Sequence, residues 1–211
     1  MKLTKLDQSG ILLEQGSSKL LIDPVHITTP LPPLADVAVL VITHKHIDHF
    51  RPEIVTKIVT NNPNIRIFTT ADASPDIPGA TIVSAGESIE VADFTLQFFG
   101  ADHAAVLEGQ IPCANIGVLV NGTFAHPGDS FDPPPSATQT LAVPISGPWL
   151  KASESVAYIQ SIKPQTVIPI HDALLSPMGL EVTGNWLRQI CADTQAEYKA
   201  LTPGESLESF L

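Results

Sequence analysis

The chain has 211 residues, enough for one domain with a substantial hydrophobic core. Its 22 acidic residues outnumber its 11 basic residues, which gives a formal net charge of −11. An acidic surface repels polyanions, so we expect no nucleic-acid partner. The longest apolar runs have the length of strands, so we expect no membrane span and no membrane partner.

The two cysteines and the first residues bear on the compartment. Cys113 and Cys191 show neither a metal-binding spacing nor the pattern of a disulfide framework. Residues 1–7 give way to polar residues without the apolar region of a secretory signal. These features predict a cytoplasmic protein. The sequence does not indicate an oligomeric state.

Strands dominate the predicted elements of the first third of the chain. Residues 11–14 and 19–23 flank a glycine-containing turn and are predicted to form a hairpin. Residues 28–33 include three prolines and are predicted to be a loop. The run at 37–42 is wholly apolar, which is typical of a strand buried on both faces. A helix is expected at 52–59 and a strand at 65–69.

More strands and two helices are predicted in the remainder of the chain. Further strands are expected at 81–83, 88–91, 94–99, 116–120, 123–126, 141–144 and 166–170. Asn121-Gly122 is a strong signal for a type I′ hairpin turn. Helices are expected at 154–162, with Ser153 as N-cap, and at 180–192. Together these elements predict one domain, residues 1–211, of mixed sheets with helices outside.

A dense group of metal-capable side chains follows the apolar strand at 37–42. Within six positions the chain carries His44, His46, Asp48 and His49. Imidazole nitrogen and carboxylate oxygen are ligands that zinc accepts, and iron or manganese to a lesser degree. One isolated histidine is usually a structural residue, but this clustering is hard to explain in that way. The motif predicts a metal site at the end of a core strand.

Three further metal-capable residues follow predicted strands. His103 comes after the strand at 94–99, Asp129 after the strand at 123–126, and His171 after the strand at 166–170. Each signal is weak alone, and Asp129 also suits a turn beside Gly128. A metal site at one sheet edge needs ligands from neighbouring strand ends, so we predict all three as ligands. His126 lies inside its strand and is more typical of a buried or supporting histidine.

In this order and spacing, the motifs resemble those of the metallo-β-lactamase superfamily. The matching elements are His44-x-His46-x-Asp48-His49, then His103, then Gly128-Asp129-Ser130, then His171. Residues 9–14, 20–24 and 126–129 are similar to the small branch that includes the ascorbate-6-phosphate lactonase-like hydrolases. Gln8 is a departure, since many relatives in that branch carry histidine there.

The resemblance implies an α/β fold, a four-layer αββα sandwich with a dinuclear metal site at one edge. His44, His46 and His103 would hold one ion, and Asp48, His49 and His171 the other, with Asp129 as the bridge. We expect two divalent metal ions, with Zn²⁺ favoured, although Mn²⁺ or iron would suit the same ligands.

The chemistry of such a centre predicts a metal-dependent hydrolase. Two ions about 3.5–4 Å apart can share a hydroxide and polarise a substrate oxygen. Asp48, as a catalytic residue, could orient that hydroxide or take its proton. The compact, acidic chain favours a small-molecule substrate, namely a lactone, ester or phosphoester.

Residues 144–151 are predicted to form a loop over the metals. Trp149 could stack on a substrate ring and Lys151 could meet an anionic group, but a core Trp149 and a solvated Lys151 are equally compatible with the sequence. His26 is a further candidate for the rim of the site. Two other functions are compatible with a metal site. One is an iron-dependent redox protein, which His46 disfavours because diiron proteins on this fold tend to carry Glu there. The other is a non-catalytic metal-binding protein.

Overall fold

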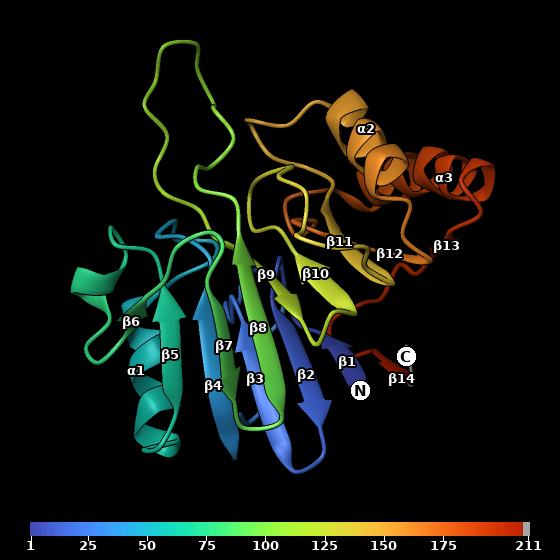
Figure 1. Ribbon diagram of the computed structural model, residues 1–211. Helices are drawn as coiled ribbons and strands as arrows, with labels where there is room; N and C mark the ends of the chain where they lie inside the picture. Colours follow the sequence, from blue (N-terminus) through green and yellow to red (C-terminus); the bar gives the residue numbers. More distant parts are fainter. Residues whose placement is uncertain (209–211) are drawn as a thin grey trace.

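Two facing β-sheets form the centre of the structure, a computed structural model that describes residues 1–208 (Figure 1). In spatial order, the first sheet contains β14 (Ser206–Glu208), β1 (Lys2–Lys5), β2 (Ile11–Gln15), β3 (Ser18–Ile22), β4 (Val37–Ile42), β5 (Arg66–Thr69) and β6 (Thr81–Ile82). The second contains β13 (Glu197–Tyr198), β12 (Thr166–Ile170), β11 (Thr140–Pro144), β10 (Phe124–His126), β9 (Gly117–Val120), β8 (Phe94–Phe99) and β7 (Ser88–Val91).

Helices cover the outer face of each sheet. The helix α1 (Pro52–Asn61) packs Ile54, Val55 and Ile58 against the first sheet. On the other side, α2 (Ala152–Ile162) and α3 (Pro177–Asp193) share a hydrophobic cluster with the second sheet. This four-layer αββα sandwich confirms the predicted fold.

The strand β4 shows why the run at 37–42 has no polar alternation. Val39 and Val41 face the core between the sheets, whereas Leu40 and Ile42 face the cluster under α1. Both faces of the strand are therefore buried, and each such side chain contributes about 1.5–3 kcal/mol relative to an exposed position. The prediction of a fully buried strand is confirmed.

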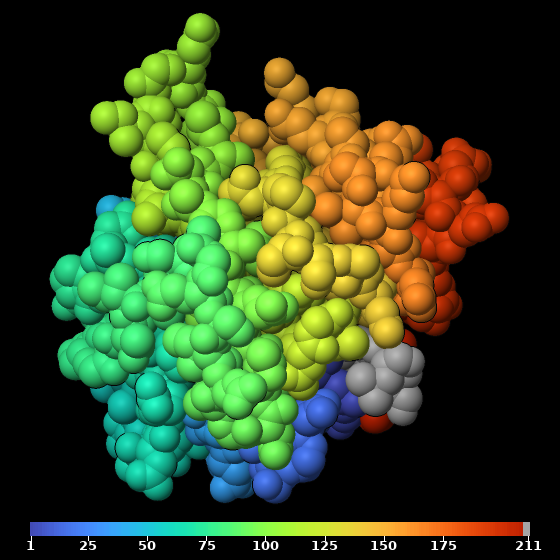
Figure 2. All heavy atoms as spheres, viewed as in Figure 1, coloured from blue at the N-terminus to red at the C-terminus, as the bar shows by residue number. Residues whose placement is uncertain are grey.

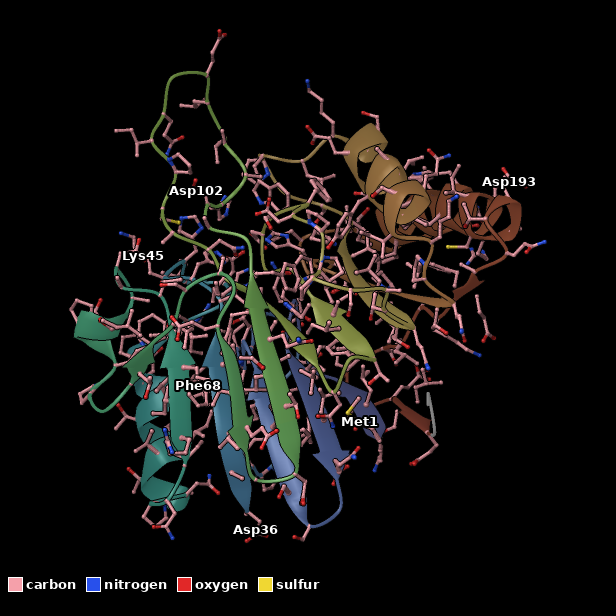
Figure 3. The ribbon with its side chains drawn as sticks, viewed as in Figure 1. Met1, Asp36, Lys45, Phe68, Asp102 and Asp193 are labelled. Carbon is pink, nitrogen blue, oxygen red and sulfur yellow. The ribbon has the colours of Figure 1, made fainter. Side chains whose placement is uncertain are left out.

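The strand directions bring several loop starts to one edge of the sandwich. β3, β4 and β5 are parallel, as are β10, β11 and β12, and β8 runs in the same direction as β10 because both are antiparallel to β9. In Figure 3, Asp36 lies at the lower end of β4, whereas Lys45 lies beyond its upper end. Asp102, which follows β8, also lies at the upper end. This edge receives the predicted metal-binding residues.

Some element boundaries differ from those expected. α2 begins at Ala152 with Lys151 as its N-cap, and not after Ser153, because the Glu154 side chain accepts a hydrogen bond from the Lys151 backbone N–H at 2.8 Å. α3 begins at Pro177, where the Ser176 hydroxyl accepts a hydrogen bond from Gly179 N at 3.1 Å. Within residues 1–208, none of the helices combines the length and the apolar character needed to cross a membrane.

Candidate metal centre

All seven residues predicted as ligands lie together at the upper edge of the sandwich. Their candidate ligand atoms form two groups, each with all atoms within 4.8 Å of one another. The first half of the cluster is His44, His46 and His103, and the second half is Asp48, His49 and His171 together with Asp129. The division matches the two ligand sets that the family resemblance implied.

Asp129 contacts both halves. Its Oδ2 atom lies 3.2 Å from His103 Nε2 and 3.9 Å from His44 Nε2, on the side of the first half. The same oxygen lies 3.1 Å from His171 Nε2, and Oδ1 lies 3.1 Å from His49 Nε2. The side chain is only 2% exposed. This position between the halves is the one that a bridging carboxylate requires.

Hydrogen bonds at the outer nitrogens turn the inner nitrogens toward the cluster. The Nδ1 atoms of His44, His49 and His103 contact the Thr43 hydroxyl, the Asp23 carboxylate and the Ala104 carbonyl at 3.0, 2.7 and 2.6 Å. Their Nε2 atoms are buried, and none makes a hydrogen bond of proper geometry within residues 1–208, although Asp129 oxygens lie 3.1 Å from His49 Nε2 and 3.2 Å from His103 Nε2. Buried polar atoms normally have partners, so these nitrogens fit a bound cation.

The electrostatics of the cluster agree with this fit. Burial lowers the pKa of the His44 imidazole well below its usual value, and the nearby His49 ring adds to the shift. Burial also lowers the pKa of His46, with help from the His103 ring. Both histidines are therefore held in the neutral form that binds metal.

The second half attracts positive charge. Burial alone would lower the pKa of His171, but contacts with Asp129 and Asp48 outweigh it and raise the pKa to about 9. Burial likewise opposes the charge on Asp129. The nearby His49, together with the close His103 and His171 imidazoles, nevertheless holds the pKa of that carboxyl well below its usual value. The Asp48 and Asp129 carboxylates therefore favour positive charge in this half, and bound divalent cations would supply it in place of the protons on the imidazoles.

Asp23 is a supporting residue that the sequence did not single out. It lies fully buried at the end of β3 and contacts His49 Nδ1 at 2.7 Å through Oδ2. The Thr43 hydroxyl donates to the same oxygen at 2.6 Å, and the Thr43 N–H donates to Oδ1 at 2.8 Å. A carboxylate behind a metal-binding imidazole fixes the ring orientation and increases its basicity.

Gln8, at the position where the family resemblance leads us to expect histidine, contacts the second half of the cluster. Its Nε2 donates to Asp48 Oδ2 at 3.1 Å, while Oε1 accepts from the Ala173 N–H at 3.0 Å. Because a backbone N–H only donates, this second bond fixes which end of the amide faces Asp48. The Gln8 carbonyl accepts a hydrogen bond from Lys5 Nζ at 2.6 Å, and Lys5 is itself fully buried and paired with Asp172 at 3.1 Å.

Asn115 and Gly128 position Asp129. The Asn115 side chain accepts a hydrogen bond from Asp129 N at 3.0 Å and donates one to the Pro127 carbonyl at 2.8 Å. Gly128 has a φ of +65°, and a Cβ there would lie 2.1 Å from Asn115 Oδ1. Only glycine fits this turn, which explains the Gly128-Asp129 pair in chemical terms.

The remaining predicted residues lie in different surroundings. Trp149 is 8% exposed, and its ring centroid lies 5.5 Å from that of His103 and 5.8 Å from that of His171. Lys151 is exposed at the start of α2. His126 uses both ring nitrogens inside the protein, toward Ser9 O and Gly128 N, as expected for a supporting histidine. His26 is exposed beside a separate cavity of about 300 Å³ between the proline-rich loop and α1.

Cys113 is a further neighbour of the cluster. Its Sγ atom lies 3.6 Å from His46 Nε2, and its carbonyl accepts a hydrogen bond from His103 N at 2.9 Å. The spacing of the two cysteines in the sequence did not anticipate this contact. No spacing signal marks Cys113, because its proximity to His46 depends on a loop that closes between residues 103 and 113.

Two facing sheets covered by helices, with a cluster of histidine and aspartate at one edge, define a metallohydrolase-type protein. The sequence matches the family model described as a β-lactamase superfamily domain over residues 2–171. The chain therefore belongs to the metallo-β-lactamase superfamily of metal-dependent hydrolases.

Curated relatives match along the whole chain. Protein Rv0786c of Mycobacterium tuberculosis is 28% identical over 217 aligned positions that cover 100% of both chains. A protein of Pelotomaculum thermopropionicum named UPF0173 metal-dependent hydrolase is 26% identical, with 99% of this chain and 100% of the relative covered.

Solved structures share the fold at lower identity. Igni18, described as a metallo hydrolase from Ignicoccus hospitalis, has a TM-score of 0.72 and 19% identity and covers 98% of this chain and 97% of its own. CmlA, a diiron β-hydroxylase from Streptomyces venezuelae, has a TM-score of 0.71 and 12% identity, with 98% of this chain and 53% of CmlA covered. At these identities the likeness shows the fold alone.

Proposed function

We propose that the protein hydrolyses a small lactone, ester or phosphoester with two divalent metal ions, zinc being favoured. The observation that supports this most directly is the convergence of seven histidine and aspartate side chains, of which His44, His49 and His103 have buried Nε2 atoms that make no hydrogen bond of proper geometry in residues 1–208. Seven ligands exceed what one tetrahedral ion can use.

The side chains divide the work in this proposal. His44, His46 and His103 hold the first ion, and His49 and His171 hold the second with Asp48. Asp129 lies 2% exposed between the halves and serves as the bridge. When bound, the two ions would supply an activated water molecule and a Lewis acid for the substrate oxygen.

Asp48 is the carboxylate that faces the reaction. Its side chain is 26% exposed, in contrast to the 2% of Asp129, so a water molecule can reach it. The bond from Gln8 Nε2 holds one oxygen in place, and the carboxylate orients the attacking water or accepts its proton. Closed coordination, the expectation for a non-catalytic protein, would leave no such opening.

The substrate is proposed to be a small molecule. The net charge of −11 offers little of the phosphate neutralisation on which polynucleotide binding depends. The Trp149 ring lies close to the His103 and His171 rings, with centroid distances of 5.5 and 5.8 Å, and is proposed to stack on a ring of the substrate. Lys151 is proposed to meet an anionic group from the exposed start of α2.

Elemental analysis and a substrate panel test the proposal together. Protein purified without chelator should contain two metal ions per chain. Lactones, aryl esters, phosphodiesters and labelled RNA should be compared with zinc and with manganese, using His46→Ala as the inactive control. One ion per chain, unchanged by added metal, would contradict the dinuclear centre.

The panel also separates the alternative functions. Efficient RNA cleavage that is lost in His46→Ala, without turnover of small molecules, would overturn the proposed substrate class. Iron content with oxygen consumption and no hydrolysis would favour the redox function that the fold hosts in CmlA.

A further inference from the structure

Exposed aliphatic side chains gather on the segments that carry the predicted ligands. Nine large hydrophobic side chains are exposed within residues 1–208, and five of them are close in sequence to members of the cluster. This apolar rim consists of Ile47 (75% exposed), Val106 (38%), Leu107 (67%), Ile111 (92%) and Leu174 (62%). An exposed apolar surface that is rimmed by polar groups is typical of a binding site, and these five side chains border the polar cluster along the chain.

The loop of residues 104–112 carries three of the five side chains. Its base is closed by the Asp102–Ala114 bridge and by the hydrogen bond from His103 N to Cys113 O at 2.9 Å. Both stems touch the cluster, since Ala104 N donates to Asp129 O at 2.8 Å and Cys113 Sγ lies 3.6 Å from His46 Nε2. The loop therefore starts and ends at the metal centre.

Beyond its base, the loop stands away from the body of the molecule. Figure 2 shows it as a projection, with an open notch between it and the segment that leads into α2. The backbone hydrogen bond from Gln110 N to Leu107 O, at 3.2 Å, forms a turn at the tip. Val106, Leu107 and Ile111 are therefore exposed on a projecting loop beside the metal centre and do not pack in the core.

Ile47 and Leu174 extend the rim to both halves of the cluster. Ile47 lies between His46 of the first half and Asp48 of the second. Leu174 follows Ala173, whose N–H is bound to the Gln8 side chain that also holds Asp48. Each half therefore has an exposed aliphatic neighbour within one to three residues of a predicted ligand.

The two cations beside the rim are already engaged, Lys45 by a carboxylate and Arg51 through its Nε by the Ile47 carbonyl at 3.1 Å. Lys45, which precedes the first motif histidines, is paired with Asp72 at 3.2 Å. Glu108 is the only charged residue of the loop at 104–112. Asp172, beside Leu174, is paired with the buried Lys5 at 3.1 Å. A highly charged phosphate group gains little from this rim, whereas an alkyl chain gains by leaving water.

We propose that the apolar rim binds the aliphatic part of the substrate, so that the enzyme acts on carboxylic esters or lactones with a medium-length alkyl chain. This inference rests on the proposed hydrolytic function of the same site. In the reaction, the water oxygen forms a new bond to the acyl carbon as the acyl–oxygen bond breaks. The departing alcohol takes up a proton, and a carboxylic acid remains.

A chain-length series tests the rim. With zinc-loaded protein, kcat/KM for aryl esters should rise from acetate to octanoate by roughly two- to fourfold for each added methylene, as long as the alkyl chain still contacts the loop of residues 104–112. In the double variant Leu107→Ser, Ile111→Ser, the series should become nearly flat while the acetate ester keeps its rate. Val182→Ser, which changes an exposed side chain of α3, is the matched control and should keep the slope.

A binding measurement separates this inference from the proposed function. Titration calorimetry with acetate, butyrate and octanoate should show affinity that rises with chain length and is lost in the double variant. If no substrate is turned over but octanoate binds in this way, the hydrolytic function fails and the apolar site stands. If esters are hydrolysed with a flat series in the wild type, the hydrolytic function stands and the inference is overturned.

The same variants test whether a second copy covers the rim. A dimer in sedimentation experiments that dissociates in the double variant, with the chain-length slope unchanged, would assign these side chains to self-association and overturn the proposal.

Discussion

The two halves of the cluster differ in charge and in support. The first half, His44, His46 and His103, contributes imidazoles that contact a hydroxyl through Nδ1, a thiol through Nε2 and a carbonyl through Nδ1, in that order. His46 is exposed. The second half includes the carboxylate of Asp48, and Asp129 groups with it.

The second half is also held by buried groups from distant parts of the chain. Asp23 supports His49, and Gln8 supports Asp48. Three of the residues here have left-handed backbone conformations, Gln8 at φ 54°, Asp23 at 44° and His171 at 59°. Backbone strain of this kind is kept only where the surrounding structure fixes it. We infer that the second half is the preorganised half and binds its cation more tightly than the first.

The largest expected effect comes from breaking the link between the halves. Asp129→Ala should lower kcat on the order of 10³-fold or more, because in the proposed centre it would separate the two cation positions and remove the charge that they share. Metal content should fall below two ions per chain. Both quantities should be measured on the same preparation.

Asp102→Ala removes an exposed carboxylate at the same edge and is the control for Asp129→Ala. It should retain metal and activity. If Asp129→Ala keeps two ions and normal kcat, Asp129 is not the bridge.

A second prediction concerns the support of His49. In the wild type, a chelator should remove the cation of the first half before that of the second. Asp23→Asn keeps the size of the side chain but removes its charge, so the affinity of the second half should fall about 10- to 100-fold. The two steps of metal release should then merge or reverse their order.

Chelator titration followed by elemental analysis measures this order. Asp36→Asn, which makes the same charge change at an exposed position at the opposite end of β4, provides a background control. Simultaneous release of both ions in the wild type would contradict the difference between the halves.

A third prediction concerns Gln8. Gln8→Leu removes the donor to Asp48 and leaves the Ala173 N–H without its partner, which costs roughly 1–3 kcal/mol of folding stability. We expect about a tenfold loss of second-half metal affinity, at the lower end of such effects. Gln8→His, which introduces the residue that the family resemblance leads us to expect there, should recover part of the affinity. Equal metal affinity in all three proteins would show that Gln8 supports the fold alone.

The metal motif could be predicted because its signals are local. An apolar strand, β4, ends where four metal-capable side chains lie within six positions, and His103, Asp129 and His171 also follow strands. Parallel strand ends meet at one edge, so a strand pattern and a residue type are enough to propose the cluster. The ligand roles themselves, and the proposed single domain, stay predictions.

The supporting residues could not be predicted because their partners are distant in sequence. Gln8 bonds to Asp48, 40 residues away, and Asp23 bonds to His49, 26 residues away. The edge strand β14 and its neighbour β1 were missed for the same reason. Leu3 pairs with Leu207 from opposite ends of the chain, and short polar strands carry little periodic signal.

The smallest expected effect lies outside both halves, at Lys151. This side chain is exposed at the start of α2 and does not contact a predicted ligand in any described interaction. An exposed charge contributes at most about 1 kcal/mol, so Lys151→Ala should raise KM for a phosphoester by no more than roughly fivefold, with kcat nearly unchanged. An uncharged alkyl ester should show no change. Lys163→Ala, at the other end of the same helix, makes the same charge change away from the loop at 144–151. If Lys151→Ala lowers kcat for esters as strongly as Asp129→Ala does, with metal retained in both, then Lys151 belongs to the catalytic centre and the site is larger than the two halves described.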